Sequence, residues 1–199
     1  MSEIISDAAL DQLFREARTH QYFDGREVSD DQITAIWDLL KMAPTSMNQL
    51  PLRIVWCKSE EAKARLAAHA APGNVEKVQN APVCAILAMD EEFHEHLPDL
   101  VPHMDAKPMF DGDDKKEMRR VSAMRNATLQ GGYFILAARA LGLDCGPMSG
   151  FDNAGVDADF FADTPSWTSN FICSVGYGDP SRLHARAPRP VFARFNRLI

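Results

Sequence analysis

The feature that most limits the possible folds is a long helical periodicity from about Lys115 to Leu141. Apolar side chains recur along it at helical spacing and form one broad face, which comprises Met118, Val121, Met124, Leu129, Ile135, Ala138 and Leu141. Small residues in the same stretch allow another helix to approach closely, and these are Ala127, Gly131, Gly132, Ala137 and Ala138. Gly142 follows as a natural left-handed stop. The pattern predicts one long helix in close contact with a second helix.

Shorter helices and strands alternate along the rest of the chain. Further helices are predicted over about 7–17 and 29–43, after Ser59, and from Asp152 to about Phe161, whereas strands are predicted over 53–58, 82–89, 143–148 and 170–175. Ser29 and Gln32 have the spacing of a capping box at the start of the second helix. The apolar run 82–89 suits a central strand that is buried on both faces. The predicted fold class is α+β, an α/β sandwich in which helices flank one sheet.

The composition favours a single domain over residues 1–199 and argues against a nucleic-acid partner. The chain is 46% hydrophobic, which is enough for a sizeable core. The chain has 21 Lys and Arg residues and 28 Asp and Glu residues. The resulting formal charge of -7 opposes general binding to a phosphate backbone. Residues 1–6 lack the pattern of a secretory signal, and no apolar run is long enough to span a bilayer. We therefore expect a cytoplasmic protein without a membrane partner.

The four cysteines are widely spaced along the sequence: Cys57, Cys84, Cys145 and Cys173. Metal-binding cysteines usually occur in close pairs, and secreted disulfide domains contain cysteines at higher density. Neither pattern is present, so the cysteines are expected to be reduced thiols that are mostly buried.

Residues 90–114 show no clean periodicity and are acidic and rich in His, Pro and Met. They predict a short helix followed by a lid or specificity segment. Substrate contact by His103 or Phe110 is one alternative, and a metal site is another. The candidate metal ligands are Glu91, His94, Glu95, His96 and His103. His94 and His96 would point to different faces of a helix, which argues against one shared metal ion.

The stretch from Ala43 to Pro51 follows the second predicted helix and reads Ala-Pro-Thr-Ser-Met-Asn-Gln-Leu-Pro. Its hydroxyl and amide side chains are bracketed by prolines that fix φ, so several hydrogen-bonding groups can be held in position for a ligand. We interpret it as half of a cofactor site. The common glycine motifs for phosphate are absent, since neither G-x-G-x-x-G nor G-x-x-x-x-G-K-[ST] occurs.

Four segments together carry a resemblance to a known family. They are Arg18-Thr19-His20, the stretch Ala43 to Pro51, the stretch Leu141 to Asp152, and Val175-Gly176-Tyr177-Gly178 followed by Arg186 and Arg189. Their order and spacing resemble the nitroreductase family of FMN-dependent oxidoreductases over about residues 8–192. Within that family, His103 to Ala106 and Gly146 to Asp152 look most similar to the branch that contains the malonic semialdehyde reductase of pyrimidine degradation.

The resemblance implies a role for each matching segment. Arg18-Thr19-His20 would hold the FMN phosphate and ribityl chain, and Arg186 and Arg189 would close on the phosphate, to which a guanidinium binds well through two hydrogen bonds. The 45–48 loop would contact the ring, and a backbone N–H in 147–150 would approach flavin N5. The implied cofactor-binding residues are Arg18, Thr19, His20, Pro44, Thr45, Ser46, Asn48, Pro147, Met148, Ser149, Gly150, Arg186 and Arg189. A solvated helix end, a plain helix-stop loop and surface arginines remain the structural alternatives.

The sequence departs from the family pattern at two places. Many members carry Lys or Arg near flavin N1 and O2, where this chain has Gln21 and Tyr22, so that the cation is absent or is supplied by Lys77 or His20. Many members also have Glu where this chain has Ser149, a change that keeps the backbone donor. The reduction potential of the flavin is the property that these departures would alter.

The resemblance implies a nitroreductase-like fold, with a mixed and mainly antiparallel sheet, and a homodimer with FMN at its interface. The Arg- and Pro-rich C-terminal arm, residues 180–199, would lie across the partner. The expected reaction is FMN-dependent reduction of malonic semialdehyde to 3-hydroxypropionate by NADPH or NADH, with no obligatory acid or base and no metal. The alternatives are a broad nitroreductase or quinone reductase, a flavin-binding member that does not reduce a substrate, and a zinc hydrolase built on the His-rich segment.

Overall fold

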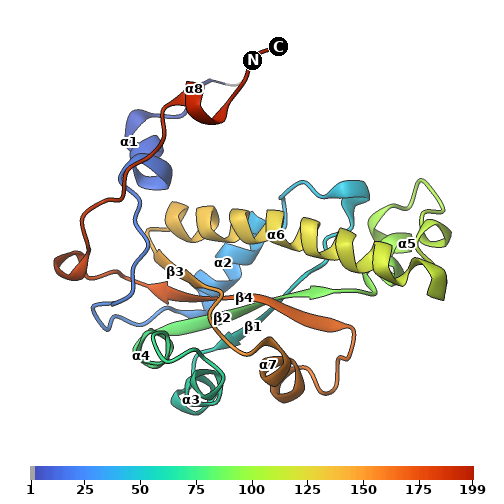
Figure 1. Cartoon of the computed structure of the whole chain (residues 1–199), viewed down its shortest axis with the longest axis horizontal. Helices are drawn as coiled ribbons and strands as arrows, with labels where there is room; N and C mark the ends of the chain where they lie inside the picture. Colours follow the sequence, from blue (N-terminus) through green and yellow to red (C-terminus); the bar gives the residue numbers. More distant parts are fainter. Residues whose placement is uncertain (1–2) are drawn as a thin grey trace.

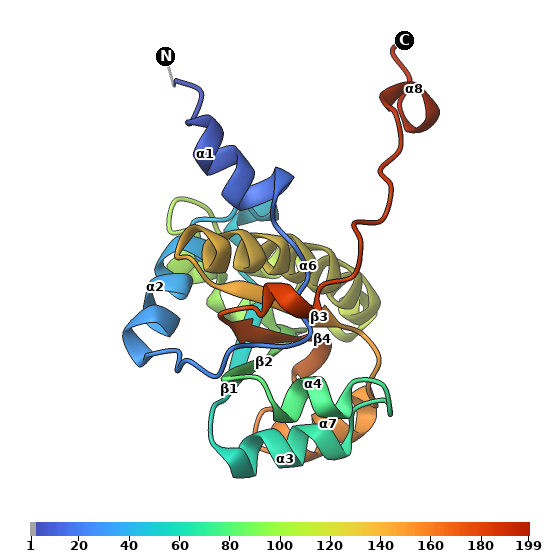
Figure 2. The same ribbon diagram turned by 90° about the vertical axis from the view of Figure 1, so that its left-hand side faces the viewer.

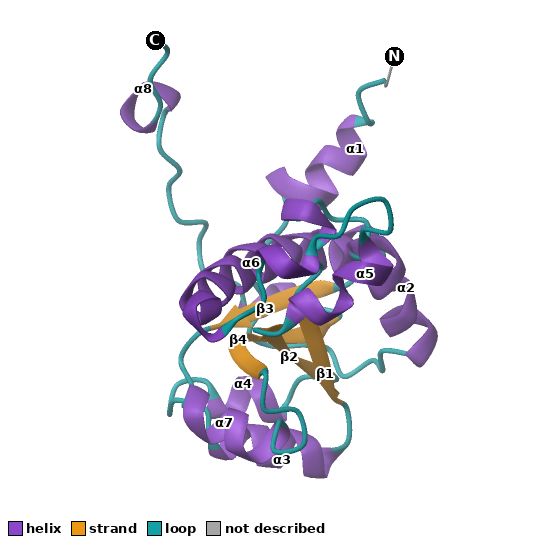
Figure 3. Ribbon diagram, turned by 90° about the vertical axis from the view of Figure 1, so that its right-hand side faces the viewer, coloured by secondary structure: helices purple, strands orange, loops and turns teal. Residues whose placement is uncertain are grey.

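The computed structural model describes residues 3–199 and contains an antiparallel sheet between two layers of helices (Figure 1). The strands are β1 (Leu52–Cys57), β2 (Val83–Asp90), β3 (Asp144–Met148) and β4 (Trp167–Gly176), in the order β1-β2-β4-β3. One face is covered by α2 (Asp30–Leu40) and α6 (Lys116–Ala140), and the other by α3 (Glu60–Ala68), α4 (Val75–Gln79) and α7 (Asn153–Phe160), as Figure 3 also shows. The predicted fold class is confirmed.

The β2 strand lies in the interior of the sheet and is buried along its whole length. It pairs antiparallel with β1 and with β4, and the register slips once, between Leu87 and Ala88. Alternate side chains enter two different cores: Leu87 packs among residues of α2 and α6, while Ile86 packs on the side of α3 and α7. The apolar run was therefore correctly predicted as a central strand buried on both faces.

The predicted caps at Ser29 and Ser59 are confirmed, whereas Asp152 precedes α7 without a side-chain capping bond. The Ser29 side chain accepts from the backbone N–H of Gln32 at 3.2 Å, and the Gln32 side chain accepts from the Ser29 N–H at 3.0 Å, which completes the capping box. Ser59 caps α3 in the same way. The first helix begins at the predicted residue as α1 (Asp7–Leu10) and continues as a π-helical turn over Asp11–Arg15. The α4 helix was not predicted, because it is little more than one turn long.

The long helix α6 has the predicted bounds to within one residue at each end, and most of the predicted small residues lie on its packed side, whereas much of the predicted apolar face is open to solvent. Met118, Val121, Met124 and Leu129 are 46%, 44%, 38% and 50% exposed. The side that packs on the sheet and on α2 consists of small and polar residues instead, together with Phe134 and Arg119: Ala123, Asn126, Ala127, Gln130, Gly131, Ala137 and Ala138. Periodicity identifies an apolar face, but it does not identify what covers that face.

The four cysteines are free and buried, one in each strand, as predicted. The remaining elements are short: α5 (Leu97–Leu100), α8 (Phe192–Phe195) and 3-10 turns at 46–48, 93–96, 107–109, 113–115 and 180–182. The N-terminal helix and the C-terminal arm both extend away from the body on the same side (Figure 2). None of the helices formed by residues 3–199 combines the length and the apolar composition that crossing a bilayer requires.

Candidate functional site

A pocket of about 270 Å³ lies where the segment after the first helix meets the C-terminal arm. It is lined by residues from three parts of the chain: Ala17, Arg18, Thr19, Gln21, Arg139, Arg182, Leu183, His184, Ala185, Arg186, Ala187 and Arg189. Four of the predicted site residues are therefore brought together, namely Arg18, Thr19, Arg186 and Arg189. We call this cavity the arginine pocket.

The guanidinium groups of the arginine pocket bind backbone carbonyls of the segments that they connect. Arg18 donates to the carbonyl oxygen of His184 at 2.6 Å, and Arg186 donates to that of Ala17 at 3.3 Å, so the two segments are tied reciprocally. No Asp or Glu lines the pocket, and none of its five arginines forms an ion pair within residues 3–199. Five cations without an ion pair give this pocket the charge that suits an anion.

A second pocket, of about 40 Å³, shares Thr19 and Gln21 with the arginine pocket. Its other lining residues are His20, Lys77, Gly146, Pro147, Met148 and Ser174. The structure thus places the predicted segment at Pro147 next to Thr19 and His20. The two pockets adjoin, so a ligand bound in the first can contact Thr19 and Gln21 of the second, which at about 40 Å³ is itself too small to enclose a ring system.

Lys77 is the cation of this smaller pocket. Its Nζ donates to Asn74 Oδ1 at 3.0 Å, and Asn74 Nδ2 donates to the carbonyl oxygen of Gly150 at 3.0 Å. The ammonium group is therefore held on the segment that carries Pro147 and Ser149. Lys77 and His20, the two candidates considered from the sequence, both line this pocket.

His20 is bound firmly into the fold. Its backbone N–H donates to the carbonyl oxygen of Cys145 at 3.0 Å, and its Nε2 lies 3.5 Å from Asp144 Oδ1. The ring packs so closely on Gly178 that a Cβ there would overlap it. The buried Nδ1 has no partner within the described residues. His20 therefore positions the edge of the smaller pocket, and glycine is required at 178.

The predicted loop around Ser46 has an unusual backbone. Met47, Asn48 and Leu50 have φ values of 50°, 50° and 41°, which non-glycine residues adopt rarely and at a cost of about 1–2 kcal/mol each. Such strain is found mainly at functional sites, where the surroundings enforce it. Here Asn48 Nδ2 donates to the carbonyl oxygen of Leu100 at 2.9 Å, and Thr45 Oγ1 accepts from the Leu50 N–H at 3.2 Å.

A polar row on α6 fixes this loop, and no sequence prediction included it. Asn126 Oδ1 accepts from the Ser46 N–H, and Asn126 Nδ2 donates to Oε1 of the buried Gln49 at 3.1 Å. Ser122 donates to the same Gln49 oxygen at 2.9 Å, and Gln130 Oε1 accepts from the Leu52 N–H at 3.0 Å. The available signal was the spacing of Ser122, Asn126 and Gln130 at i, i+4 and i+8.

The loop around Ser46 and the arginine pocket lie at different positions along the axis of α6. Asn126 holds the loop and Arg139 lines the pocket, and the 13 residues between them correspond to about 20 Å along the helix axis. One chain therefore does not bring Pro44, Thr45, Ser46 and Asn48 together with Arg18. The predicted residues fall into two groups, and their role in binding stays a prediction.

The two candidate substrate residues lie near the loop. His103 is exposed in a turn of the 97–110 segment, whose Leu100 carbonyl accepts from Asn48. Phe110 is 8% exposed and packs edge-to-face on Phe93, with ring centroids 5.1 Å apart. Their contact with a substrate also stays a prediction.

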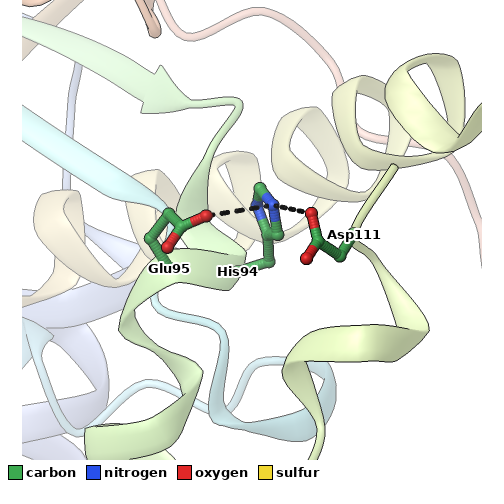
Figure 4. Close-up of side chains that lie close together, drawn as sticks. All are labelled: His94, Glu95 and Asp111. Carbon is green, nitrogen blue, oxygen red and sulfur yellow. Dashed lines mark ion pairs between the residues drawn. The ribbon is translucent and has the colours of Figure 1, made fainter. Parts of the chain in front are cut away.

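Part of the His-rich segment forms a charged cluster (Figure 4). The Nε2 of His94 lies 3.5 Å from Glu95 Oε1 and 3.7 Å from Asp111 Oδ1, and the three residues could surround a cation. Lys107 Nζ already lies 3.1 Å from the Glu95 carboxylate and 3.3 Å from that of Asp111. These contacts raise the pKa of Lys107, because its hydrogen bonds to both carboxylates favour the charged ammonium. Lys107 is thus the cation of this cluster.

Comparison with known proteins agrees with this architecture. A family model described as the nitroreductase family matches residues 14–177. The "Putative NADH dehydrogenase/NAD(P)H nitroreductase" of Rhodopseudomonas palustris (strain TIE-1) is 54% identical over 199 residues, which is 100% of both chains.

Solved structures share the fold at low sequence identity. A "putative nitroreductase in complex with FMN" from Exiguobacterium sibiricum has a TM-score of 0.84 and 19% identity, with 100% of both chains covered. The gut-bacterial enone reductase CLA-ER has a TM-score of 0.76 and 18% identity, and the match covers 92% of this chain and 95% of that one.

Proposed function

Because the chain belongs to the nitroreductase family, we propose that it is an FMN-dependent NAD(P)H oxidoreductase that reduces a small electrophilic substrate. Our first candidate is malonic semialdehyde, which would give 3-hydroxypropionate. The proposal takes its reaction type from the relatives' names and its substrate from the resemblance of His103 to Ala106 and Gly146 to Asp152.

The observation that carries the proposal is the arginine pocket with its adjoining smaller pocket. A phosphate monoester is a dianion that arginine binds through two parallel hydrogen bonds, and five unpaired guanidiniums suit it. Thr19 and Gln21 line both pockets, so they would contact the chain between phosphate and ring. The residues of the arginine pocket therefore fit the phosphate end of FMN.

When bound, FMN would accept a hydride from the nicotinamide and deliver it to the substrate. The part of the protein is to hold and orient FMN and to polarise its ring. Lys77, tied through Asn74 to the Gly150 carbonyl, would place a positive charge beside the ring and favour electron uptake. The backbone of Pro147 to Gly150 would present the N–H that meets flavin N5.

A second copy of the chain would complete the site. The strained loop at Ser46 lies about 20 Å along α6 from the arginine pocket, so a partner's loop is needed if one flavin is to touch both groups. The exposed apolar side of α6 offers a surface for that partner, since Met118, Val121, Met124 and Leu129 are open to solvent. We propose a homodimer with FMN at its interface.

The deciding experiment is steady-state NADPH and NADH oxidation by the FMN-loaded protein with malonic semialdehyde, a quinone and a nitroaromatic compound. A clear preference in kcat/KM for the aldehyde supports the substrate. Similar low rates on all three would remove malonic semialdehyde and leave the broad nitroreductase or quinone reductase. A yellow protein that neither dinucleotide bleaches without oxygen would instead indicate a flavin-binding member without reductase activity.

A further inference from the structure

We infer that the arginine pocket takes a second anionic group, the 2′-phosphate of NADPH, and that Arg182 is the residue that binds it. The enzyme then prefers NADPH to NADH. The inference rests on the proposed function, since it names the electron donor of that same site.

The first argument is charge. Arg18, Arg139, Arg182, Arg186 and Arg189 line one pocket that has no acidic lining residue within the described part of the chain. A phosphate monoester carries about -1.5 to -2 at neutral pH. One flavin phosphate therefore leaves about three positive charges unbalanced. A second phosphate monoester neutralises most of this excess, and a 2′-phosphate is the group that distinguishes NADPH from NADH.

The second argument is which of the guanidiniums already make hydrogen bonds within the protein. Four of them already donate to backbone carbonyls: Arg18 to His184, Arg139 to Leu13, Arg186 to Ala17, and Arg189 to Ala187 and Pro188. Arg182 has no such bond within residues 3–199. Its guanidinium carbon lies 3.2 Å from the centroid of the Tyr22 ring. Stacking uses the face of the guanidinium and leaves its in-plane N–H donors free for a phosphate.

The third argument is that the backbone around Arg182 is fixed. Asp179 accepts hydrogen bonds from the Ser181 N–H at 2.9 Å and from the Ser181 hydroxyl at 2.6 Å, which caps the 3-10 turn Pro180–Arg182. The Asp179 N–H donates to the Tyr22 carbonyl at 3.0 Å. Asp179 is the acidic group of this turn: its pKa is lowered by the hydrogen bonds from Ser181 and, to a smaller extent, by the charge of Arg182, with which it forms no ion pair within residues 3–199. The turn holds Arg182 over the ring of Tyr22.

The binding test needs no turnover. Calorimetry with 2′,5′-ADP and with 5′-AMP measures the contribution of a 2′-phosphate to the wild type and to Arg182→Gln. The wild type is expected to bind 2′,5′-ADP about 10- to 100-fold more tightly than 5′-AMP, as one charged hydrogen-bonded group provides. In Arg182→Gln, most of this difference in affinity between 2′,5′-ADP and 5′-AMP should be lost. Arg194→Gln, an arginine on the same arm outside the pocket, is the matched control and should keep it.

The kinetic test follows anaerobic reduction of bound FMN by NADPH and by NADH. The wild type should show a higher kcat/KM for NADPH, and Arg182→Gln should bring the two values to within about threefold, with each rate expressed per FMN bound. Equal preference for 2′,5′-ADP and 5′-AMP in the wild type, or an unchanged ratio in Arg182→Gln, overturns the inference. A wild type that retains no FMN counts against the proposed function, and the 2′,5′-ADP measurement still decides this inference.

Discussion

The backbone N–H of Ser46 donates a hydrogen bond of 2.8 Å to Oδ1 of Asn126, across 80 residues of sequence. Asn126 is 3% exposed and also donates to Gln49, so one amide holds both ends of a strained turn. The loop that resembles a flavin-contacting segment is thus shaped by the long helix rather than by its own sequence.

Asn126→Ala should therefore weaken FMN binding, although Asn126 is not among the residues predicted to contact the flavin. The substitution removes the acceptor of the Ser46 N–H and a donor to the buried Gln49, and the loss of such a hydrogen bond costs about 0.5–1.5 kcal/mol. We expect FMN to dissociate about tenfold more readily, measured by flavin fluorescence on dilution. Thr128→Ala, which removes an exposed hydroxyl from the same helix, is the control. Equal flavin retention in the two variants would show that the loop does not serve the cofactor.

Asn48→Gly removes the side-chain amide without adding strain to the backbone. Alanine at a φ of 50° adds strain, whereas glycine adopts this angle freely. The variant should lower FMN occupancy while keeping the thermal unfolding midpoint within a few degrees. Met47→Gly, at the same φ, is the control and should retain the cofactor. Normal flavin occupancy in purified Asn48→Gly would mean that the site is placed wrongly.

Lys77→Met should make the bound flavin harder to reduce. Loss of a positive charge beside the ring lowers its midpoint potential by about 30 mV or more, the equivalent of about 1.4 kcal/mol for two electrons. Lys77→Arg should restore most of the potential. Lys58→Met, which removes an exposed lysine paired with Asp30, should have no effect. Spectroelectrochemical titration measures the midpoint potential of the flavin in all three variants. A potential in Lys77→Met equal to that of the wild type would exclude Lys77 from this role.

Gly178→Ala should destabilise the fold, because the added methyl group would overlap the His20 ring. We expect a loss of about 1–3 kcal/mol in the free energy of unfolding by urea. Gly73→Ala, in an open turn with no atom near the added carbon, should be neutral or slightly stabilising. If both variants unfold at the wild-type urea concentration, the tight packing of His20 is wrong.

The buried thiols predict an alkaline loss of stability. Burial raises the pKa of Cys57 to about 11 and that of Cys84 to about 12, from an ordinary value of 9.0. Above pH 9 the unfolded chain releases these protons and the folded chain keeps them, so the free energy of unfolding falls between about pH 9 and pH 11, by about 1.4 kcal/mol per thiol and pH unit. Cys57→Ala should flatten this slope in urea titrations at pH 8 to 10.5, and an unaltered slope would contradict the assignment.

Local signals predicted the elements of the fold well. The capping box at Ser29, the cap at Ser59 and the left-handed stop at Gly142, whose φ is 77°, depend only on neighbours in sequence. The apolar run that became β2 is also a local property. The polar residues on the buried side of α6 were not predicted, because the partners of that side, the sheet and α2, are selected by the tertiary fold, and polar residues can be buried wherever those partners supply hydrogen bonds.

The candidate site could be predicted only in part. The motif residues Arg18, Arg186 and Arg189 do lie in one pocket, since the order of segments carries that information. Arg139 and Arg182 carry no motif, and only the fold places them beside the others. The link from Lys77 through Asn74 to Gly150 spans two surface segments, and no periodicity in the sequence records it.

The orientation of α6 has a thermodynamic consequence. Its polar side faces the sheet, where the side-chain oxygens of Asn126 and Gln130 accept from the Ser46 and Leu52 N–H groups, and its methionines and leucine face water. In the proposed homodimer a second chain covers those side chains, so the folding equilibrium would contain a bimolecular step. The melting temperature is therefore expected to rise with protein concentration, and the stability on which evolution acts would then be that of the pair.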